Sequence, residues 1–438
     1  MKQVDQLLHA RWIVTVNEHN DLFEYHTLVV DQSKIIDILP TELAKQSYRA
    51  HQVDDLGEQL LMPGLINAHT HLAMNLLRGF ADDLPLMEWL EQQIWPAEGR
   101  WVDEQFVADG SELAMAELIR SGTTCFNDMY FFPEITAQVA QKAGLRASIG
   151  LMMIDFPTAW GSGPEEYLQK GLALQQKYQD HPLIRTAFAP HATYTVSDVP
   201  LLQLKQAAQQ HNSAIHIHLH ETAGEIALHE KQHGCRPLAR LDKLGMLNAN
   251  LQAVHMTQLS DEEIQQLADN GVQVIHCPES NLKLASGFAP IARLLAAGVN
   301  VALGTDGAAS NNDLDLFAEM RTAALLAKGV AGDASVVPTT TALRMATING
   351  AKALGIADQT GSLEVGKAAD VIAIDLNTIE TQPLYDPVSQ LVYASSRNQI
   401  THLWVAGKQL LKERQLTTLD ETQIIKKAQL WQKKIGGQ

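Results

Sequence analysis

Between residues 65 and 306, short β-rich segments alternate with longer stretches of helical periodicity, and this alternation constrains the fold most strongly. Repeated β-α units build a parallel sheet, because each helix returns the chain to the same end of the next strand. Eight units over roughly 250 residues are typical of a closed barrel. The predicted strands are LINAHTHL (65–72), TTCFNDM (123–129), RASIGL (146–151), IRTAFAPHA (184–192), SAIHIHLHE (213–221), LQAVHMT (251–257), VQVIHCP (272–278) and VNVALGTD (299–306).

The two ends of the chain have a different pattern. Residues 1 to about 60, and the residues after about 360, contain short strand-like segments separated by turns. We therefore predict an α/β fold, with a (β/α)8 TIM-type barrel and a small β-sandwich domain formed from both termini. The expected catalytic barrel covers residues 63–363, and the composite domain covers residues 1–62 and 364–438.

Charge and composition narrow the classes of partner. The chain carries 33 Lys+Arg against 50 Asp+Glu, a formal charge of −17, which repels phosphate backbones and anionic headgroups. We expect a small-molecule substrate, with no nucleic-acid and no membrane partner. No apolar segment reaches the ~20 residues of a membrane span, and the three cysteines form no CxxC pair. A reducing, cytoplasmic location is expected.

Histidine and aspartate gather near the ends of the predicted strands, where barrel enzymes build their sites. His69 and His71 are two residues apart, so a strand directs both side chains to the barrel interior. His218 lies near the end of the fifth strand, and Asp306 ends the eighth. Three imidazoles and one carboxylate suit Zn²⁺, and Fe²⁺, Mn²⁺ or Co²⁺ accept similar ligands. We expect one zinc ion per subunit.

Other histidines offer competing interpretations. The chain has 17, and most are expected to be ordinary surface or hydrogen-bonded residues. His216 and His220 share the strand parity of His218, so one is expected in the interior layer and the other just beyond the strand end; either is an alternative ligand. The pattern on four strands, which includes His255 on the sixth, favours a metal site.

The segments that carry these residues resemble the amidohydrolase superfamily, specifically its 5′-methylthioadenosine/S-adenosylhomocysteine deaminase family. The resemblance extends from MPGLINAHTH to GSLEVGKAADVIAID and rests on PGLINAHTHLAMNLLRG, HLHET, VHMTQLSDEE, HCPESNLKLASG and LGTDGAASNNDLD. It implies the zinc ligands His69, His71, His218 and Asp306. It also assigns Glu221 to the substrate ring and His255 to proton handling.

This resemblance implies hydrolytic deamination at the C6 atom of an adenosine-like nucleoside. Asp306 and His255 would accept the proton of the attacking water, and Glu221 would protonate N1 of the purine to make C6 electrophilic. Glu98 resembles the family's ribose carboxylate, and His191 the histidine that reaches the N3 edge. Trp89 resembles an aromatic residue that covers the ligand, although a core tryptophan would look the same in sequence.

One departure bears on the substrate. Family members that take S-adenosylhomocysteine present arginine after the third strand, but IDFPTAWGSGPEEYLQ has no Arg or Lys before Lys170. Phe156, Trp160 and Gly161 suit an uncharged thioether, so 5′-methylthioadenosine is preferred, with adenosine or 5′-deoxyadenosine next. A neighbouring subunit of a homo-oligomer could still supply an arginine for S-adenosylhomocysteine.

Three alternatives remain. A binuclear cyclic amidase would need a bridging lysine on the fourth strand, where IRTAFAPHATY offers His191 and no lysine. A guanine deaminase or a triazine chlorohydrolase would keep the ligands but leave Glu98 without a ribose. A non-catalytic scaffold would be expected to have lost ligands that this chain retains.

Overall fold

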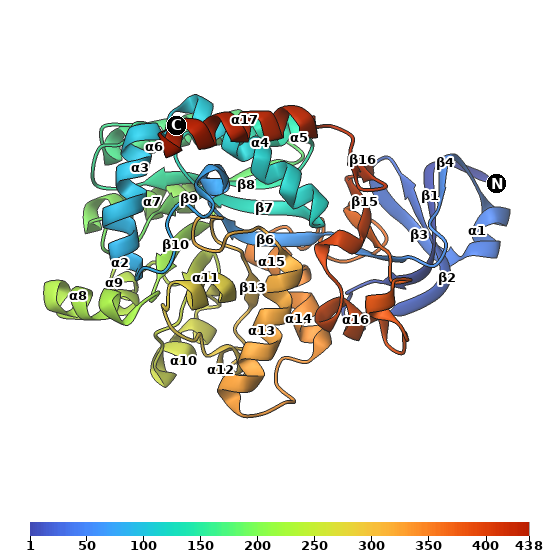
Figure 1. The fold of residues 1–438 in the computed structure, drawn as a ribbon. Coiled ribbons are helices and arrows are strands. Elements are labelled where there is room, and N and C mark those ends of the chain that lie inside the picture. The colour runs from blue at the N-terminus through green and yellow to red at the C-terminus, as the bar shows by residue number, and fades with distance from the viewer. Residues whose placement is uncertain (438) are drawn as a thin grey trace.

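The computed structural model describes residues 1–437 and contains an eight-stranded parallel sheet surrounded by helices (Figure 1). The strands follow one another in sequence order around the sheet, and a parallel bridge between Thr70 and Asp306 joins its first and last strands. The predicted TIM-type barrel is confirmed. Its strands are β6 (Leu65–Thr70), β7 (Thr123–Met129), β8 (Arg146–Met153), β9 (Ile184–Pro190), β10 (Ile215–Leu219), β11 (Leu251–His255), β12 (Gln273–His276) and β13 (Val301–Leu303).

Helices separate these strands and cover the outside of the barrel. Strands β7 and β8 are buried along their whole length, as expected when a parallel strand has side chains on one face and helices on the other. The helices are α4 (Glu104–Arg120), α5 (Pro133–Ala143), α6 (Pro164–Tyr178), α7 (Asp198–His211), α8 (Ala223–His233), α9 (Pro237–Lys243), α10 (Asp261–Asp269), α11 (Pro278–Lys283), α12 (Ile291–Ala296), α13 (Leu316–Ala331), α14 (Thr339–Met345) and α15 (Ile348–Ala353).

Local sequence explains where several helices begin and end. Asp103 accepts from the backbone N–H of Phe106 at 2.7 Å and starts α4, while Ser260 and Glu263 form a reciprocal capping box at α10. Helix α5 ends at Gly144, whose φ of 85° is readily adopted only by glycine.

The connection between β6 and α4 is longer and contains several short helical segments. They lie over the mouth of the barrel and carry two of the predicted substrate-binding residues, Trp89 and Glu98. The segments are η1 (Leu72–Leu77), α2 (Leu86–Trp89), η2 (Leu90–Ile94) and α3 (Trp95–Trp101).

Both termini contribute to a second, mixed sheet, which confirms the predicted small domain. Strand β5 pairs with β1 from the N-terminal part and with β14 from the C-terminal part. Its strands are β1 (Lys2–Val14), β2 (Leu22–Asp31), β3 (Lys34–Pro40), β4 (Tyr48–Asp55), β5 (Leu60–Pro63), β14 (Val371–Ile374), β15 (Ile400–Val405), β16 (Lys408–Lys412) and β17 (Gln415–Leu416). Its short helices are α1 (Thr41–Ser47), η3 (Ile379–Thr381), α16 (Pro387–Tyr393) and η4 (Arg397–Gln399).

The exact domain boundaries stay predictions. The last helix, α17 (Glu421–Gly436), lies along α4 of the barrel in Figure 1. Trp431 on α17 donates its indole N–H to Asp109 on α4 at 3.0 Å. The chain therefore returns to the barrel after completing the small sheet.

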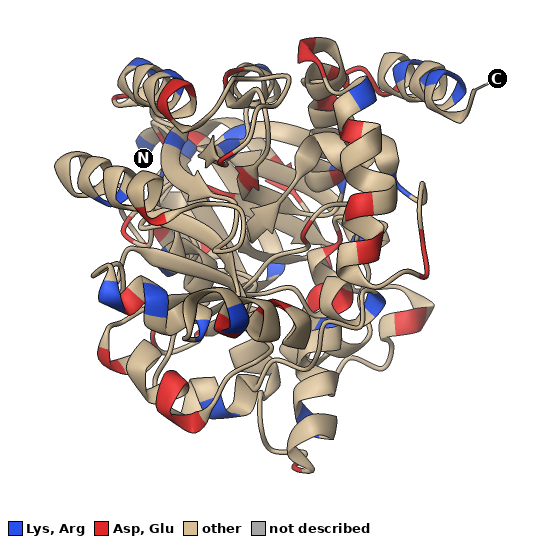
Figure 2. Ribbon diagram, turned by 90° about the vertical axis from the view of Figure 1, so that its left-hand side faces the viewer, with Lys and Arg blue, Asp and Glu red and all other residues tan. Residues whose placement is uncertain are grey.

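Charged residues lie mainly on the outer helices and loops, and few lie on the barrel strands (Figure 2). Among residues 1–437, none of the helices combines the length and apolarity that crossing a bilayer requires.

A buried ion pair connects the barrel to the small sheet. The guanidinium of Arg146, at the start of β8, contacts both carboxylate oxygens of Asp370 at 2.9 and 3.3 Å. Asp370 also accepts from the backbone N–H of Ala406 at 2.7 Å. The side chain of Asp370 is fully buried and that of Arg146 nearly so.

Replacing Asp370 with Asn should leave Arg146 buried without a counter-charge. We expect the free energy of unfolding to fall by about 3–5 kcal/mol, measured by urea denaturation. The exposed pair between Arg11 and Glu58 provides the control, since Glu58→Gln should cost less than about 1 kcal/mol. Equal losses in the two variants would contradict the role assigned to the buried pair.

Candidate metal centre and active-site pocket

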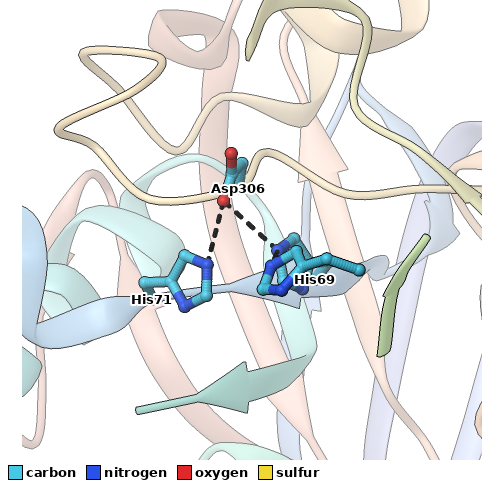
Figure 3. Close-up of side chains that lie close together, drawn as sticks. His69, His71 and Asp306 are labelled. Carbon is cyan, nitrogen blue, oxygen red and sulfur yellow. Dashed lines mark hydrogen bonds and ion pairs between the residues drawn. The ribbon is translucent and has the colours of Figure 1, made fainter. Parts of the chain in front are cut away.

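Four predicted ligands meet at one end of the barrel. His69 lies on β6, His71 follows it directly, His218 lies on β10, and Asp306 follows β13. One ligand atom from each lies within 4.8 Å of the other three. Figure 3 shows the carboxylate of Asp306 facing both His69 and His71.

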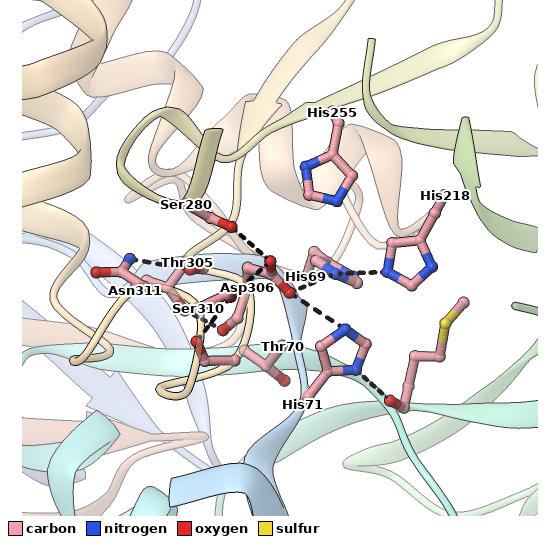
Figure 4. Close-up of polar contacts among 12 residues, drawn as sticks. His69, Thr70, His71, His218, His255, Ser280, Thr305, Asp306, Ser310 and Asn311 are labelled. Atoms are coloured by element: carbon pink, nitrogen blue, oxygen red, sulfur yellow. Dashed lines mark hydrogen bonds and ion pairs between the residues drawn. The ribbon is translucent and has the colours of Figure 1, made fainter. Parts of the chain in front are cut away.

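The contacts within this cluster are short. Oδ1 of Asp306 lies 3.2 Å from Nε2 of His69 and 3.1 Å from Nε2 of His71. Nε2 of His69 also lies 3.2 Å from Nε2 of His218, as Figure 4 shows. Several lone pairs therefore face one small volume, the arrangement that a shared cation stabilises.

The outward-facing nitrogens of two rings support this interpretation. Nδ1 of His71 donates to the backbone carbonyl of Met129, and Nδ1 of His218 donates to that of His191 at 2.7 Å. A carbonyl can only accept, so each ring carries a proton on Nδ1, and Nε2 is the nitrogen that faces the cluster and can bind a metal ion. The structure thus selects the tautomer that a metal ion requires.

Asp306 is held from the opposite side. Its Oδ2 atom accepts from the hydroxyls of Ser280 at 2.7 Å and Ser310 at 2.8 Å, which leaves Oδ1 facing the histidines (Figure 4). Sequence analysis missed both serines, because a serine near a strand end has no distinctive spacing.

Protonation states also fit a cation. Burial lowers the pKa of His69 to about 4, which keeps this imidazole neutral. Burial alone would raise the pKa of Asp306, but its contacts with the rings of His69 and His71 outweigh burial and hold this pKa well below its usual value. At His71, burial lowers the pKa, but the hydrogen bond and the charge of Asp306 outweigh it and raise this pKa to about 9, so a bound metal ion would have to displace a proton from this ring. The donor set fits a single divalent cation.

Left-handed backbone conformations occur beside the centre. His220, His255, Met256 and Asp306 have φ values of 53°, 75°, 51° and 62°. Such conformations cost a non-glycine residue on the order of 1–3 kcal/mol and collect at functional sites. At Asp306 and His255, they turn the chain sharply at a strand end.

Two of the three predicted proton-transfer residues, Glu221 and His255, are neighbours. Nε2 of His255 lies 3.7 Å from the carboxylate of Glu221, and Nδ1 of His255 contacts Oδ1 of Asn281 at 2.9 Å. Burial raises the pKa of Glu221 and so favours its protonated form. A carboxylic acid here can donate a proton.

Glu225 holds the backbone of Glu221, and sequence analysis missed it. Its carboxylate accepts from the backbone N–H of Glu221 at 2.6 Å and from that of His220 at 3.3 Å. Thr257 donates its hydroxyl to the Glu221 carbonyl at 2.6 Å. The Thr222-x-x-Glu225 spacing, typical of a helix start, was the available signal.

The predicted substrate-binding residues line one pocket together with three of the four cluster residues, His71, His218 and Asp306. Trp89, Glu98, His191, Glu221, His255 and Asp306 all face it. Trp89 is largely buried and donates its indole N–H to the Ala81 carbonyl at 3.1 Å. Nδ1 of His191 contacts the Thr195 hydroxyl at 3.0 Å, and burial lowers the pKa of His191 to about 3.

Glu98 has a partner that sequence analysis did not identify. The hydroxyl of Tyr130 donates to Glu98 Oε1 at 2.7 Å. Burial raises the pKa of Glu98 to about 7, although the hydrogen bond from Tyr130 lowers it. The rest of the lining is largely apolar, and it includes no arginine or lysine from the described chain.

The two alternative ligands lie outside the cluster. Nε2 of His216 lies 2.8 Å from Nδ1 of His69, on the far side of that ring from Asp306. His220, just beyond the end of β10, contacts the Gln258 carbonyl through Nδ1 and accepts from the Leu238 N–H through Nε2.

A family model described as "Amidohydrolase family" matches residues 60–410. A protein from Teredinibacter turnerae named 5-methylthioadenosine/S-adenosylhomocysteine deaminase is 53% identical, with 99% of this chain and 98% of that protein covered. A 5′-deoxyadenosine deaminase from Methanosarcina mazei is 41% identical, with 97% of each covered.

Solved structures agree with the fold. A zinc-bound adenosine deaminase from Xanthomonas campestris superposes with a TM-score of 0.98 at 49% identity, covering 100% of both chains. A zinc-bound atrazine chlorohydrolase from Arthrobacter aurescens gives 0.90 at 22% identity, covering 97% of this chain and 99% of that one. At that identity, the second likeness concerns the fold alone.

The Tyr130 contact can be tested through the ionisation of Glu98. Because Tyr130 stabilises the carboxylate, Tyr130→Phe should raise the pKa of Glu98 further above about 7. The measurement is a pH titration of the carboxyl stretch by infrared spectroscopy of ¹³C-glutamate-labelled protein. Subtracting the Glu98→Gln spectrum assigns the band. An unshifted titration in Tyr130→Phe would contradict the assigned contact.

Proposed function

This chain belongs to the amidohydrolase family, and we propose that it hydrolyses the C6 amino group from an adenosine-like nucleoside, releasing ammonia. The observation that carries the proposal is that three members of the metal cluster, His71, His218 and Asp306, line a single pocket with Glu221 and Glu98. A hydrolytic centre and a carboxylate suited to ribose therefore contact the same ligand. The 53% identity to a 5-methylthioadenosine/S-adenosylhomocysteine deaminase over nearly the whole chain supports this activity.

We infer that the divalent cation is Zn²⁺, held by His69, His71, His218 and Asp306. A mainly imidazole donor set suits zinc, and the Xanthomonas campestris relative was solved with zinc bound. Fe²⁺, Mn²⁺ or Co²⁺ would be accepted by the same donors. The chemistry that the ion supplies when bound is Lewis-acid activation, which lowers the pKa of water to about 7.

The side chains then divide the proton transfers. Asp306 and His255 lie beside the centre and accept the proton of the attacking water. Protonated Glu221 donates to N1 of the purine, which withdraws electron density from C6 and permits attack there. Protonation of the exocyclic amine lets ammonia leave, and the product is the 6-oxo nucleoside.

Glu98 directs the choice of a nucleoside over a free base. The hydroxyl of Tyr130 uses one lone pair of Glu98 Oε1, so the remaining lone pairs of this carboxylate can accept from the 2′- and 3′-hydroxyls of a ribose. His191 faces the N3 edge of the purine, and Trp89 covers the ligand.

The pocket favours an uncharged 5′ substituent. Phe156, Pro157 and Ala159 line it, and no arginine or lysine of the described chain does. The other two residues predicted for the thioether, Trp160 and Gly161, are not part of this lining, and the indole N–H of Trp160 donates to Glu134. The carboxylate of S-adenosylhomocysteine would lose hydration without gaining a cationic partner. We therefore rank 5′-methylthioadenosine first, adenosine or 5′-deoxyadenosine second, and S-adenosylhomocysteine last unless a neighbouring subunit supplies an arginine.

The alternative is a guanine deaminase or triazine chlorohydrolase on the same barrel. Either would bind a ligand without a ribose, and a buried carboxylate facing that ligand would then have no hydroxyls to compensate its desolvation.

A substrate panel tests the proposal. The metal-loaded protein should convert 5′-methylthioadenosine to 5′-methylthioinosine, measured as loss of absorbance at the adenine band and release of ammonia. We expect kcat/KM to be lower for adenosine and lower still for S-adenosylhomocysteine. Guanine and atrazine serve as controls for the alternative. Turnover of either, with none of the nucleosides, would exclude the proposed function.

Replacing Glu221 with Gln should separate metal binding from proton transfer. Glutamine keeps the size of the side chain but cannot protonate N1, so kcat should fall by roughly 10²- to 10⁴-fold. Metal content measured by atomic emission should stay unchanged. The exposed Glu230, on α8, supplies the control variant Glu230→Gln, with normal turnover expected. Full activity in Glu221→Gln would show that another group protonates the ring.

A further inference from the structure

A chain of hydrogen bonds runs from the metal cluster into the core of the barrel. Nδ1 of His69 lies 2.8 Å from Nε2 of His216, and Nδ1 of His216 lies 3.0 Å from Oε1 of Gln252. Gln252, on β11, donates its amide NH₂ to the carbonyl of Ala353 at 2.8 Å. All three side chains are at most 1% exposed, so no solvent competes for these contacts.

The backbone carbonyl of Ala353, at the end of this series of hydrogen bonds, determines which atoms donate and which accept. Ala353 can only accept, so Gln252 must direct its NH₂ there and its Oε1 toward His216. Asn127 reinforces this orientation, since it donates to Oε1 of Gln252 at 3.2 Å and to the Ala68 carbonyl at 3.1 Å. If the Gln252 amide were flipped, its oxygen would face the Ala353 carbonyl oxygen and its NH₂ would face the NH₂ of Asn127.

The orientation of Gln252 then determines which nitrogen carries the proton in both imidazoles. Oε1 of Gln252 can only accept, so His216 carries its proton on Nδ1 and offers the Nε2 lone pair to His69. His69 therefore carries its proton on Nδ1 and presents the Nε2 lone pair to the cluster. Burial disfavours a charged imidazolium at either ring, which leaves the choice between neutral tautomers.

We propose that His216 and Gln252 are positioning residues that set the tautomer of His69 and so raise the affinity of the centre for its metal ion. The competing tautomer is also accessible. With the proton on Nε2 of His216, Asn127 would donate to Nδ1 of His216 at 3.1 Å, and His69 would donate through Nε2 to Asp306. In that state, Nε2 of His69 carries a proton and cannot bind a metal ion. Oε1 of Gln252 would also face the Nδ1 lone pair of His216, and two acceptors repel each other.

His216 and Gln252 support His69 as backbone carbonyls support His71 and His218. Within residues 1–437, no backbone carbonyl contacts Nδ1 of His69, which faces the core. His216 and the amide of Gln252 instead connect this atom to the carbonyl of Ala353. Removing the partner of a metal-binding histidine typically weakens metal affinity about 10- to 100-fold.

The experiment measures Zn²⁺ affinity of the full-length protein by chelator competition. Gln252→Met removes the acceptor without touching the cluster, and we expect the dissociation constant to rise about 10-fold or more. His216→Leu should raise it further. His216→Gln, whose amide can accept from His69 and donate to Gln252, should recover part of the loss.

A second measurement separates tautomer control from general loosening of the core. ¹⁵N-histidine NMR of the metal-free protein should show His69 protonated on Nδ1 in the wild type and redistributed toward Nε2 in Gln252→Met. The matched control is His276→Leu, which removes a buried histidine from the neighbouring strand β12, one whose Nδ1 atom has no partner. It should leave the affinity and the His69 tautomer unchanged.

The inference rests on the proposed metal-dependent function, and the outcomes distinguish the two. Failure of the wild type to bind Zn²⁺ would remove the metal centre itself. If the wild type binds Zn²⁺ and Gln252→Met binds it equally well with an unchanged His69 tautomer, the tautomer proposal is wrong and the metal centre stands. Equal weakening in Gln252→Met and His276→Leu would also overturn it.

Discussion

The convergence of three imidazole lone pairs and one carboxylate oxygen is the interaction on which the site depends. In water, four such groups would separate, because each is better solvated alone than packed against other electron-rich atoms. The barrel holds them together because their strands are tied to one another by backbone hydrogen bonds and covered by helices. A divalent cation converts this unfavourable packing into a favourable one.

Three kinds of contact fix the four ligands. His71 and His218 donate to backbone carbonyls, His69 connects through two side chains to a carbonyl in the core, and Asp306 accepts from two serines. The contacts of His69 and Asp306 are buried and those of His71 and His218 are partly buried, so water competes little for them. The left-handed backbone at Asp306 is tolerated because these contacts and the bridge to Thr70 determine its position.

Burial acts in opposite directions on the acids and the bases of the pocket. It lowers the pKa of His191 and His69, which keeps imidazoles neutral, and it raises the pKa of Glu98 and Glu221, which favours protonated acids. The same physical cause therefore favours a neutral imidazole at His69 and a proton-donating acid at Glu221. The largely apolar lining that produces this effect also disfavours a charged 5′ substituent.

The sequence by itself determined the elements and the type of chemistry. The alternation of β-rich and helical segments predicts a barrel, and the two-residue spacing of His69 and His71 directs both to its interior, because these signals are local and follow from strand and helix periods. What the tertiary structure alone decided is which distant side chains meet. His216 has the same spacing from His218 as a ligand would have, yet it lies behind His69. Tyr130 and Gln252 carry no local signal of their partners, and the helix-start spacing of Glu225 does not indicate that its carboxylate holds Glu221. Their roles depend on distances between strands far apart in the chain, and those distances are set by the closure of the barrel.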